Sequence, residues 1–170
     1  MILPLADFPT IQPPAIVIIQ EQKVAHDNWV AEQARLAEEA RLAELARIAE
    51  EARKAAEKAL QERLMTALPR PNSFAWGNCT YFTAGLINIP WSGNANRWDD
   101  NARRMGYAVD NNPTVGSVFQ TDAGWAGHVG IVVIVEGDNV FVREMNVLGL
   151  NRISTRWVHK SKFKYIHVPV

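Results

Sequence analysis

The stretch GHVGIVVIVEGDNVFVREMN, residues 127–146, predicts a β-hairpin. Its first part is rich in Val and Ile, a composition that is typical of a buried strand. EGDN at 136–139 is a turn signal, and VFVREMN at 140–146 fits the returning strand. We therefore expect two antiparallel strands joined by a short turn, with the rest of a folded domain built around them.

The polar residues of this hairpin indicate a site. If the turn is centred near Gly137, His128 lies opposite Asn146 or its neighbour, with Glu144 one diagonal step away. Glu and Asn are unusual on a strand face that begins with valines, but they suit groups that orient an imidazole and fix its tautomer. For His128 alone, a hydrogen-bonded histidine at a strand end is the structural alternative.

A single cysteine, Cys79, follows Gly77 and Asn78 in FAWGNCTYF at 74–82. Free cysteine is often only a small buried hydrophobe, and that is one interpretation. The other is a nucleophile, because CTYFTAGLIN fits a helix that begins at the cysteine, with Asn78 as N-cap. The helix N-terminus favours thiolate, and its free N–H groups could hold an oxyanion. A cysteine nucleophile needs a base, which His128 could supply.

The overall charge excludes some partners. The 170 residues include 18 Lys and Arg and 18 Asp and Glu, so the net charge is zero. Nucleic acid and anionic membranes therefore have no electrostatic support as main partners. The longest apolar run is also far shorter than the roughly 18 residues of a spanning helix, so we expect no membrane span.

The N-terminal segment, residues 1–22, is apolar and rich in proline. It differs from a signal peptide because it carries Asp7 and has no Lys or Arg before the apolar part. We expect an extended segment and no signal peptide.

Residues 23–68 predict one long charged helix. Arg, Leu, Ala and Glu recur in a six-residue repeat over 35–58, and opposite charges alternate every three residues. Neighbours at this spacing contact each other on a helix surface. LPRP at 68–71 ends the helix, because proline cannot continue it.

The six-residue period does not match a coiled coil. Each repeat advances about 240° around the helix, so Leu36, Leu42 and Ile48 point in three directions. A coiled coil needs an apolar seam every 3.5 residues. We expect a solvated single helix that acts as a spacer or docking arm. A self-associating helix, or one that docks in a virion, is the alternative.

Several motifs in 69–170 occur in the order of a known family. WGNCTYF, GNANRWDDNARRMGY, PTVGSVF, GHVGIVV and REMN resemble the CHAP domain (cysteine, histidine-dependent amidohydrolase/peptidase) from about Pro71 to Val170. The resemblance implies an α+β, papain-like fold, in which a helix that carries the nucleophile packs on an antiparallel sheet. It also implies cleavage of amide bonds in bacterial peptidoglycan.

The resemblance assigns roles to individual residues. Cys79 matches the nucleophile and His128 the general base, while Glu144 and Asn146 match positions that orient the histidine. Asn78 stands where the family often has Gln, and we expect it to polarise the substrate carbonyl. Trp125 and Trp76 join it as substrate-binding candidates, since sugars and peptides stack on aromatic rings. For the tryptophans, a role in the core or as loop anchors is the alternative.

No cofactor or metal is expected. Some members of the family bind calcium through acidic residues just upstream of the cysteine, but PRPNSFAWGN at 69–78 contains no Asp or Glu. The acidic residues Asp99, Asp100, Asp110 and Asp122 fit turns and caps.

The resemblance implies a peptidoglycan hydrolase, either an N-acetylmuramoyl-L-alanine amidase or an endopeptidase. A phage endolysin that waits in the host cytoplasm for a holin, or a virion-borne lysin, is the expected setting. A non-catalytic virion protein that keeps the fold and a bacterial toxin amidase are the alternatives.

Overall fold

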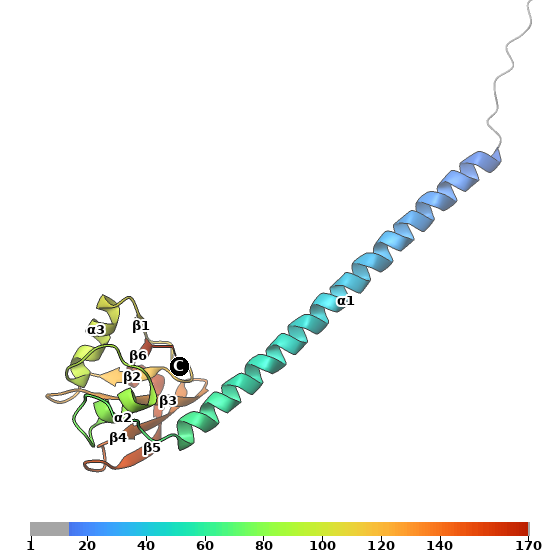
Figure 1. Cartoon of the computed structure of the whole chain (residues 1–170). Coiled ribbons are helices and arrows are strands. Elements are labelled where there is room, and N and C mark those ends of the chain that lie inside the picture. Colours follow the sequence, from blue (N-terminus) through green and yellow to red (C-terminus); the bar gives the residue numbers. More distant parts are fainter. Residues whose placement is uncertain (1–13, 170) are drawn as a thin grey trace, which may run out of the picture. The chain divides into compact units, whose positions relative to one another are not determined.

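The computed structural model describes residues 14–169. The chain divides into two units, Met1–Ala52 and Arg53–Val170. The first unit contributes only helix within the described residues, and the second holds the end of that helix and an α+β domain (Figure 1). The α+β fold that the sequence predicts is confirmed.

Helix α1 spans Pro14–Thr66. The extended conformation expected for 1–22 is therefore wrong for residues 14–22, which are helical, while 1–13 lie outside the described residues. The helix ends just before LPRP, as expected. In the described part of the chain, no helix is both long and apolar enough to cross a membrane.

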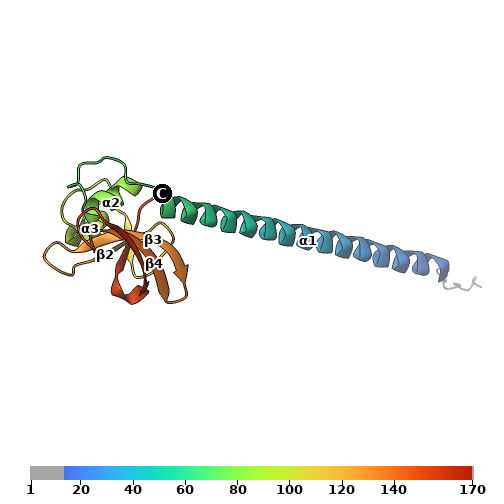
Figure 2. The same cartoon turned by 90° about the horizontal axis from the view of Figure 1, so that it is seen from below.

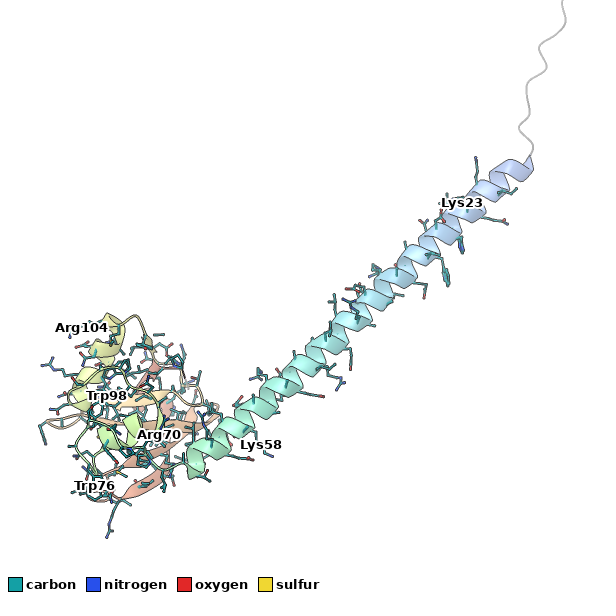
Figure 3. All side chains as sticks on the ribbon, viewed as in Figure 1. Lys23, Lys58, Arg70, Trp76, Trp98 and Arg104 are labelled. Atoms are coloured by element: carbon teal, nitrogen blue, oxygen red, sulfur yellow. The ribbon has the colours of Figure 1, made fainter. Side chains whose placement is uncertain are left out.

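The side chains of α1 within 19–52 follow the charge pattern of the sequence. Arg35 pairs with Glu32 and Arg47 pairs with Glu44, each at 2.6 Å and one helical turn apart. Figure 3 shows side chains extending from α1 on several sides, Lys23 among them. The apolar residues of the repeat are exposed. Whether this segment is a solvated arm or associates with another chain stays a prediction.

One antiparallel sheet organises the second unit. In the described residues it has six strands in the order β1-β6-β2-β3-β4-β5. The strands are β1 (Ala108–Asp110), β2 (Val118–Thr121), β3 (His128–Glu136), β4 (Asn139–Met145), β5 (Ile153–His159) and β6 (Lys164–His167). The short helices are α2 (Cys79–Leu86), α3 (Trp98–Arg104), η1 (Ala95–Arg97) and η2 (Lys160–Lys162).

The central hairpin of β3 and β4 has the expected register. Gly130 pairs with Glu144, so His128 lies one pair beyond, level with Asn146. A bulge at Val133 shifts the register nearer the turn. The hairpin that the sequence predicts is thus confirmed together with the diagonal relation of His128 and Glu144.

The apolar run of β3 is buried because hydrophobic clusters cover both faces of the sheet. Ile131 belongs to one cluster with Trp98 of α3, and Val132 belongs to the other with Phe119 and Val142. Helices α2 and α3 lie on the same side of the sheet (Figure 1 and Figure 2). In this arrangement α2 packs against β3 and β4.

The end of α1 is anchored in the second unit by a buried arginine. Arg143 of β4 donates from Nη1 to the carbonyl oxygens of Leu64 and Ala67, at 2.7 Å each. Its guanidinium also lies over the ring of Phe82 in α2, 5.2 Å from the centroid. Leu64 itself is buried in the cluster that contains Trp98. A cation that binds the last carbonyls of a helix compensates groups that the helix leaves unpaired.

Candidate active site

Cys79 is the first residue of α2, as the sequence predicts. The preceding residue, Asn78, has extended backbone angles (φ −92°, ψ 164°), which is the usual conformation of an N-cap. Its side chain makes no capping hydrogen bond. The thiol is partly buried, and the backbone N–H groups of Thr80 and Val129 donate to the sulfur. The sulfur therefore sits where unpaired helix N–H groups favour its anionic form.

His128 lies between the cysteine and a carboxylate. Its Nε2 is 3.1 Å from Oε2 of Glu144, and its ring also makes a hydrogen bond with the thiol of Cys79. Since Nε2 is engaged by Glu144, Nδ1 is the ring nitrogen that is left for the sulfur. His128 opens β3 and Glu144 lies near the end of β4, so the hairpin register sets this contact.

The charge states of Cys79 and His128 depend on each other. Burial lowers the pKa of His128, but hydrogen bonds and charge from Cys79 and Glu144 outweigh it and raise the pKa to about 9. Burial raises the pKa of the Cys79 thiol, but His128 and the two N–H donors lower it overall. A thiolate on Cys79 and an imidazolium on His128 therefore stabilise each other.

Glu144 is fully buried, with 0% of its surface exposed. Arg156 of β5 donates from Nε to Oε1 at 2.7 Å and from a second guanidinium nitrogen to Oε2 at 3.2 Å. Burial raises the pKa of Glu144, but the hydrogen bonds from His128 and Arg156 bring it below its usual value. The carboxylate is thus ionised and has a partner for each oxygen.

Arg156 is a site residue that the sequence does not predict. Its place follows only from the pairing of β4 and β5, in which it faces Val142 and is a diagonal neighbour of Glu144. The sequence offers only an indirect indication: ISTRWVH at 153–159 alternates between side chains on the two faces of a strand, and Arg156 is one of them.

Asn146 lies level with His128, as expected, but its side chain contacts Asn78. It follows β4 with a left-handed backbone (φ 71°), and its Nδ2 donates to Oδ1 of Asn78 at 2.9 Å. Among the described contacts, the imidazole of His128 is bound by Glu144, and the role of Asn146 in orienting it stays a prediction. Asn78 in turn donates from Nδ2 to the carbonyl of Ala75 at 3.3 Å. The Asn78–Asn146 pair joins the two loops beside the nucleophile.

A groove of about 430 Å³ opens beside Cys79. Residues 73–75, 78–80, 92–95 and 125–127 line it. Trp125 is 87% exposed at its edge, so it is available to a ligand. Trp76 is also exposed, at the edge of the domain (Figure 3), but it is not among the described residues that line the groove.

The other tryptophans near the motif belong to the core. Trp91 and Trp98 are buried and meet edge to face, with centroids 6.0 Å apart. They are therefore packing residues, which is the alternative given above for the tryptophans of this region.

The acidic residues outside this site form ion pairs and turns. Asp99 is buried and binds Lys164 at 2.6 Å, and Asp110 accepts from the N–H of Asn112 in a tight turn. Within the described residues, no group of three or more His, Cys, Asp or Glu side chains is arranged to hold a metal ion.

Comparison with known proteins supports the family resemblance. Residues 69–146 match the family model of the CHAP domain. The chain is 42% identical over 107 residues to the probable autolysin LDP of Staphylococcus aureus, covering 58% of this chain and 38% of that protein. It is 40% identical over 109 residues to the N-acetylmuramoyl-L-alanine amidase sle1 of the same species, covering 56% and 32%. The chain thus spans less than half the length of these relatives.

Solved structures give the same fold. The structure of an N-acetylmuramoyl-L-alanine amidase from Staphylococcus aureus aligns with a TM-score of 0.50 at 26% identity, over 58% of this chain and 33% of that chain. The structure of Ly7917 aligns with a TM-score of 0.50 at 16% identity, over 66% and 62%, which shows the fold alone.

Proposed function

We propose that the CHAP domain of this chain is a cysteine hydrolase that cleaves an amide bond of bacterial peptidoglycan. The carrying observation is the chain of contacts from Cys79, at the start of α2, through His128 to the buried carboxylate of Glu144. A nucleophile, a base and an oriented carboxylate in this order are the constellation of acyl-transfer enzymes. The groove beside the sulfur provides room for a polymeric substrate.

The first half of the reaction forms a thioester. The Cys79 thiolate attacks the amide carbonyl, and backbone N–H groups at the start of α2 stabilise the oxyanion that develops. The imidazolium of His128 then donates its proton to the leaving nitrogen, the C–N bond breaks and the amine departs. Glu144 holds the ring with Nδ1 toward the reacting atoms throughout.

The second half restores the enzyme. Neutral His128 takes a proton from water, the resulting hydroxide attacks the thioester, and the C–S bond breaks. The products are a carboxylic acid and the thiolate paired with imidazolium. Each step uses groups that the site already places within contact.

We place the cut at the N-acetylmuramoyl-L-alanine bond. The support is that the sle1 protein and the protein of the aligned solved structure are both N-acetylmuramoyl-L-alanine amidases by name. Endopeptidase cleavage in the stem or cross-bridge uses the same residues and is the competing specificity, because the shape of the groove decides between them.

The biological setting is a further part of the proposal. We expect a phage lysin, either released through a holin or carried in the virion with the helix as a docking arm. A bacterial autolysin or toxin amidase is the competing setting, and the staphylococcal relatives favour a bacterial one. Detection of the chain in purified phage particles by mass spectrometry would favour the virion.

Digestion of purified peptidoglycan tests the activity. Wild type and Cys79→Ala are incubated with walls of several types, and the soluble products are identified by mass spectrometry. We expect fragments with a free N-terminal L-alanine from wild type and at least a thousandfold less from Cys79→Ala. The intrinsic fluorescence of the six tryptophans, of which Trp98 is fully buried, shows whether both proteins are folded.

The products separate the alternatives. A new amine on another residue, with N-acetylmuramoyl-L-alanine intact, would establish an endopeptidase. Equal release by wild type and Cys79→Ala would contradict the cysteine mechanism. No release from any wall would contradict hydrolysis altogether and favour the non-catalytic virion protein.

A further inference from the structure

Arg156 makes the most extensive polar contact with the site among residues outside the expected set. Its Nε and a terminal nitrogen approach both oxygens of Glu144, at 2.7 and 3.2 Å. Two parallel N–H···O bonds fix the plane of a carboxylate as well as its position. Oε2, which receives the longer of these bonds, is the oxygen that contacts His128.

The surroundings of Arg156 hold the guanidinium in place. Its central carbon lies 5.9 Å from the ring centroid of Phe163, and the rings of Phe163 and Phe119 are tilted against each other with centroids 4.5 Å apart. Phe119 in turn lies 5.8 Å from the ring of His128. Arg156 and His128 are therefore connected through a packed aromatic pair as well as through Glu144.

We propose that Arg156 is a positioning residue for the Cys79–His128 pair, acting through Glu144. A fully buried carboxylate needs a partner for each oxygen, and without Arg156 one oxygen of Glu144 has none of the partners described above. The carboxylate would then rotate or take up a proton, and either change weakens its hold on Nε2 of His128. The imidazolium loses stability, and the thiolate that depends on it is lost as well.

The inference about Arg156 rests on the proposed function, but only its turnover assay requires peptidoglycan to be the substrate. The state of the Cys79–His128 pair is measured independently, as the rate at which iodoacetamide alkylates Cys79 at different pH values. If peptidoglycan is not the substrate, turnover fails for every variant, while the alkylation profile still reports on Arg156.

The test compares Arg156→Met and Arg156→Lys with wild type. In Arg156→Met we expect the inflection of the alkylation profile to move to higher pH by about one unit. On a soluble muramoyl peptide, kcat falls by about 10- to 100-fold with little change in KM, because Arg156 does not line the groove. Arg156→Lys keeps the charge but offers no fork of two donors, so it should restore only part of the loss.

A purely electrostatic role makes the opposite prediction. Removing a cation near His128 would make imidazolium easier to form, so the alkylation inflection would move to lower pH. That shift, complete restoration by Lys, or a loss confined to KM would each overturn the positioning role.

Arg104→Met is the matched control. It removes an exposed arginine of α3 that contacts Asn101, outside the site, and should leave both profiles unchanged. The melting temperature of each variant shows whether it is folded. If Arg156→Met is unfolded, the test depends on Arg156→Lys. A wild-type kcat and a wild-type alkylation profile in the Arg156→Lys variant would contradict the proposal.

Discussion

At the scale of single residues, the charge of Glu144 is balanced on two sides. His128 contacts one oxygen, while Arg156 binds both, and the carboxylate has no exposed surface. A buried ion is stable only when it is paired and hydrogen-bonded, so the two cations are needed for Glu144 to remain ionised. Of these charges, the positive charge on His128 is the one that contacts Cys79, and it lowers the pKa of the thiol.

The pH dependence of hydrolysis follows from the Cys79–His128 pair. The reactive form carries a thiolate and an imidazolium, so kcat/KM rises as Cys79 loses its proton and falls as His128 loses its own. The lowered pKa of Cys79 places the rising limb below the usual thiol range. The raised pKa of His128 places the falling limb at about 9. We expect a bell-shaped profile on the soluble substrate whose falling limb lies at about 9.

Glu144→Gln checks the cause of the falling limb. The amide keeps the shape of the side chain but lacks the charge that stabilises imidazolium, so this limb should move down from about 9. A wild-type falling limb near 6.5, the ordinary histidine value, would contradict the ion pair.

The residues that sequence predicts correctly are those fixed by local rules. The start of a helix locates Cys79, and the two-residue period of a hairpin with a clear turn locates His128 and Glu144. The same period places Asn146 level with His128, but it does not predict that the strand ends at Met145, that φ becomes positive at Asn146 or that its side chain contacts Asn78. Arg156 escapes prediction because the connection between β4 and β5 spans residues 146–152, and its Gly149 and Asn151 do not fix the register of β5 as a two-residue turn would.

At the scale of elements, the loop before β3 positions both Trp125 and His128. Asn96 of η1 donates its backbone N–H to the carbonyl of Ala126 at 2.9 Å, and its side chain donates to the carbonyl of Trp125 at 3.1 Å. The loop approaches η1 most closely at Gly127, where a Cβ would lie 2.5 Å from the backbone nitrogen of Asn96. Only glycine permits this contact.

Two glycines in this loop separate backbone strain from steric contact. Gly124 and Gly127 both have left-handed backbones (φ 77° and 71°), but a Cβ at Gly124 meets nothing within 4 Å. Gly124→Ala should therefore cost only the conformational strain, roughly 1–2 kcal/mol in the free energy of unfolding. Gly127→Ala adds a backbone clash and should cost about 2–5 kcal/mol.

Activity should follow the same order. Gly127→Ala displaces the loop from η1 and moves His128 away from Cys79, so kcat/KM should fall at least tenfold, whereas Gly124→Ala should stay near wild type. Denaturant unfolding and hydrolysis assays measure the two effects. Equal results for the two variants would show that the contact with Asn96 does not position the loop.

The sequence predicts the elements themselves with one instructive error. The prolines of the N-terminal segment favour an extended chain, yet Pro14 is the first residue of α1. Proline is tolerated there, because the first N–H groups of a helix have no partner within it and the fixed φ suits a helix. Proline at the other end, in LPRP, does end the helix, as its missing N–H requires.

At the scale of the whole molecule, the boundary between the two units differs from the change in composition. Composition changes near residue 68, which suggests a domain of 69–170. The compact unit instead begins at Arg53, because the last turns of α1 belong to it. Leu64 is buried there, and the carbonyls of Leu64 and Ala67 are the acceptors for Arg143. The continuous charged repeat conceals this change of environment, since the helix itself does not break.

Two truncations distinguish these boundaries. A fragment of 53–170 retains Leu64 and both acceptors, so its free energy of unfolding should match that of the same domain in the full chain. A fragment of 69–170 loses a buried leucine and leaves Arg143 without those acceptors. We expect it to be less stable by about 2–5 kcal/mol, from the lost apolar burial and the unpaired polar group.

Leu64→Ala in the full chain separates these two contributions. It removes the apolar side chain but keeps the carbonyl that Arg143 binds, so it should cost about 2–5 kcal/mol by itself if packing dominates. If Leu64→Ala is mild while 69–170 is strongly destabilised, the hydrogen bonds of Arg143 contribute more to stability than the packing of Leu64. Equal stability of 53–170 and 69–170, measured by urea unfolding, would show that the end of α1 is an appendage after all. The same result would place the boundary at the end of the charged repeat.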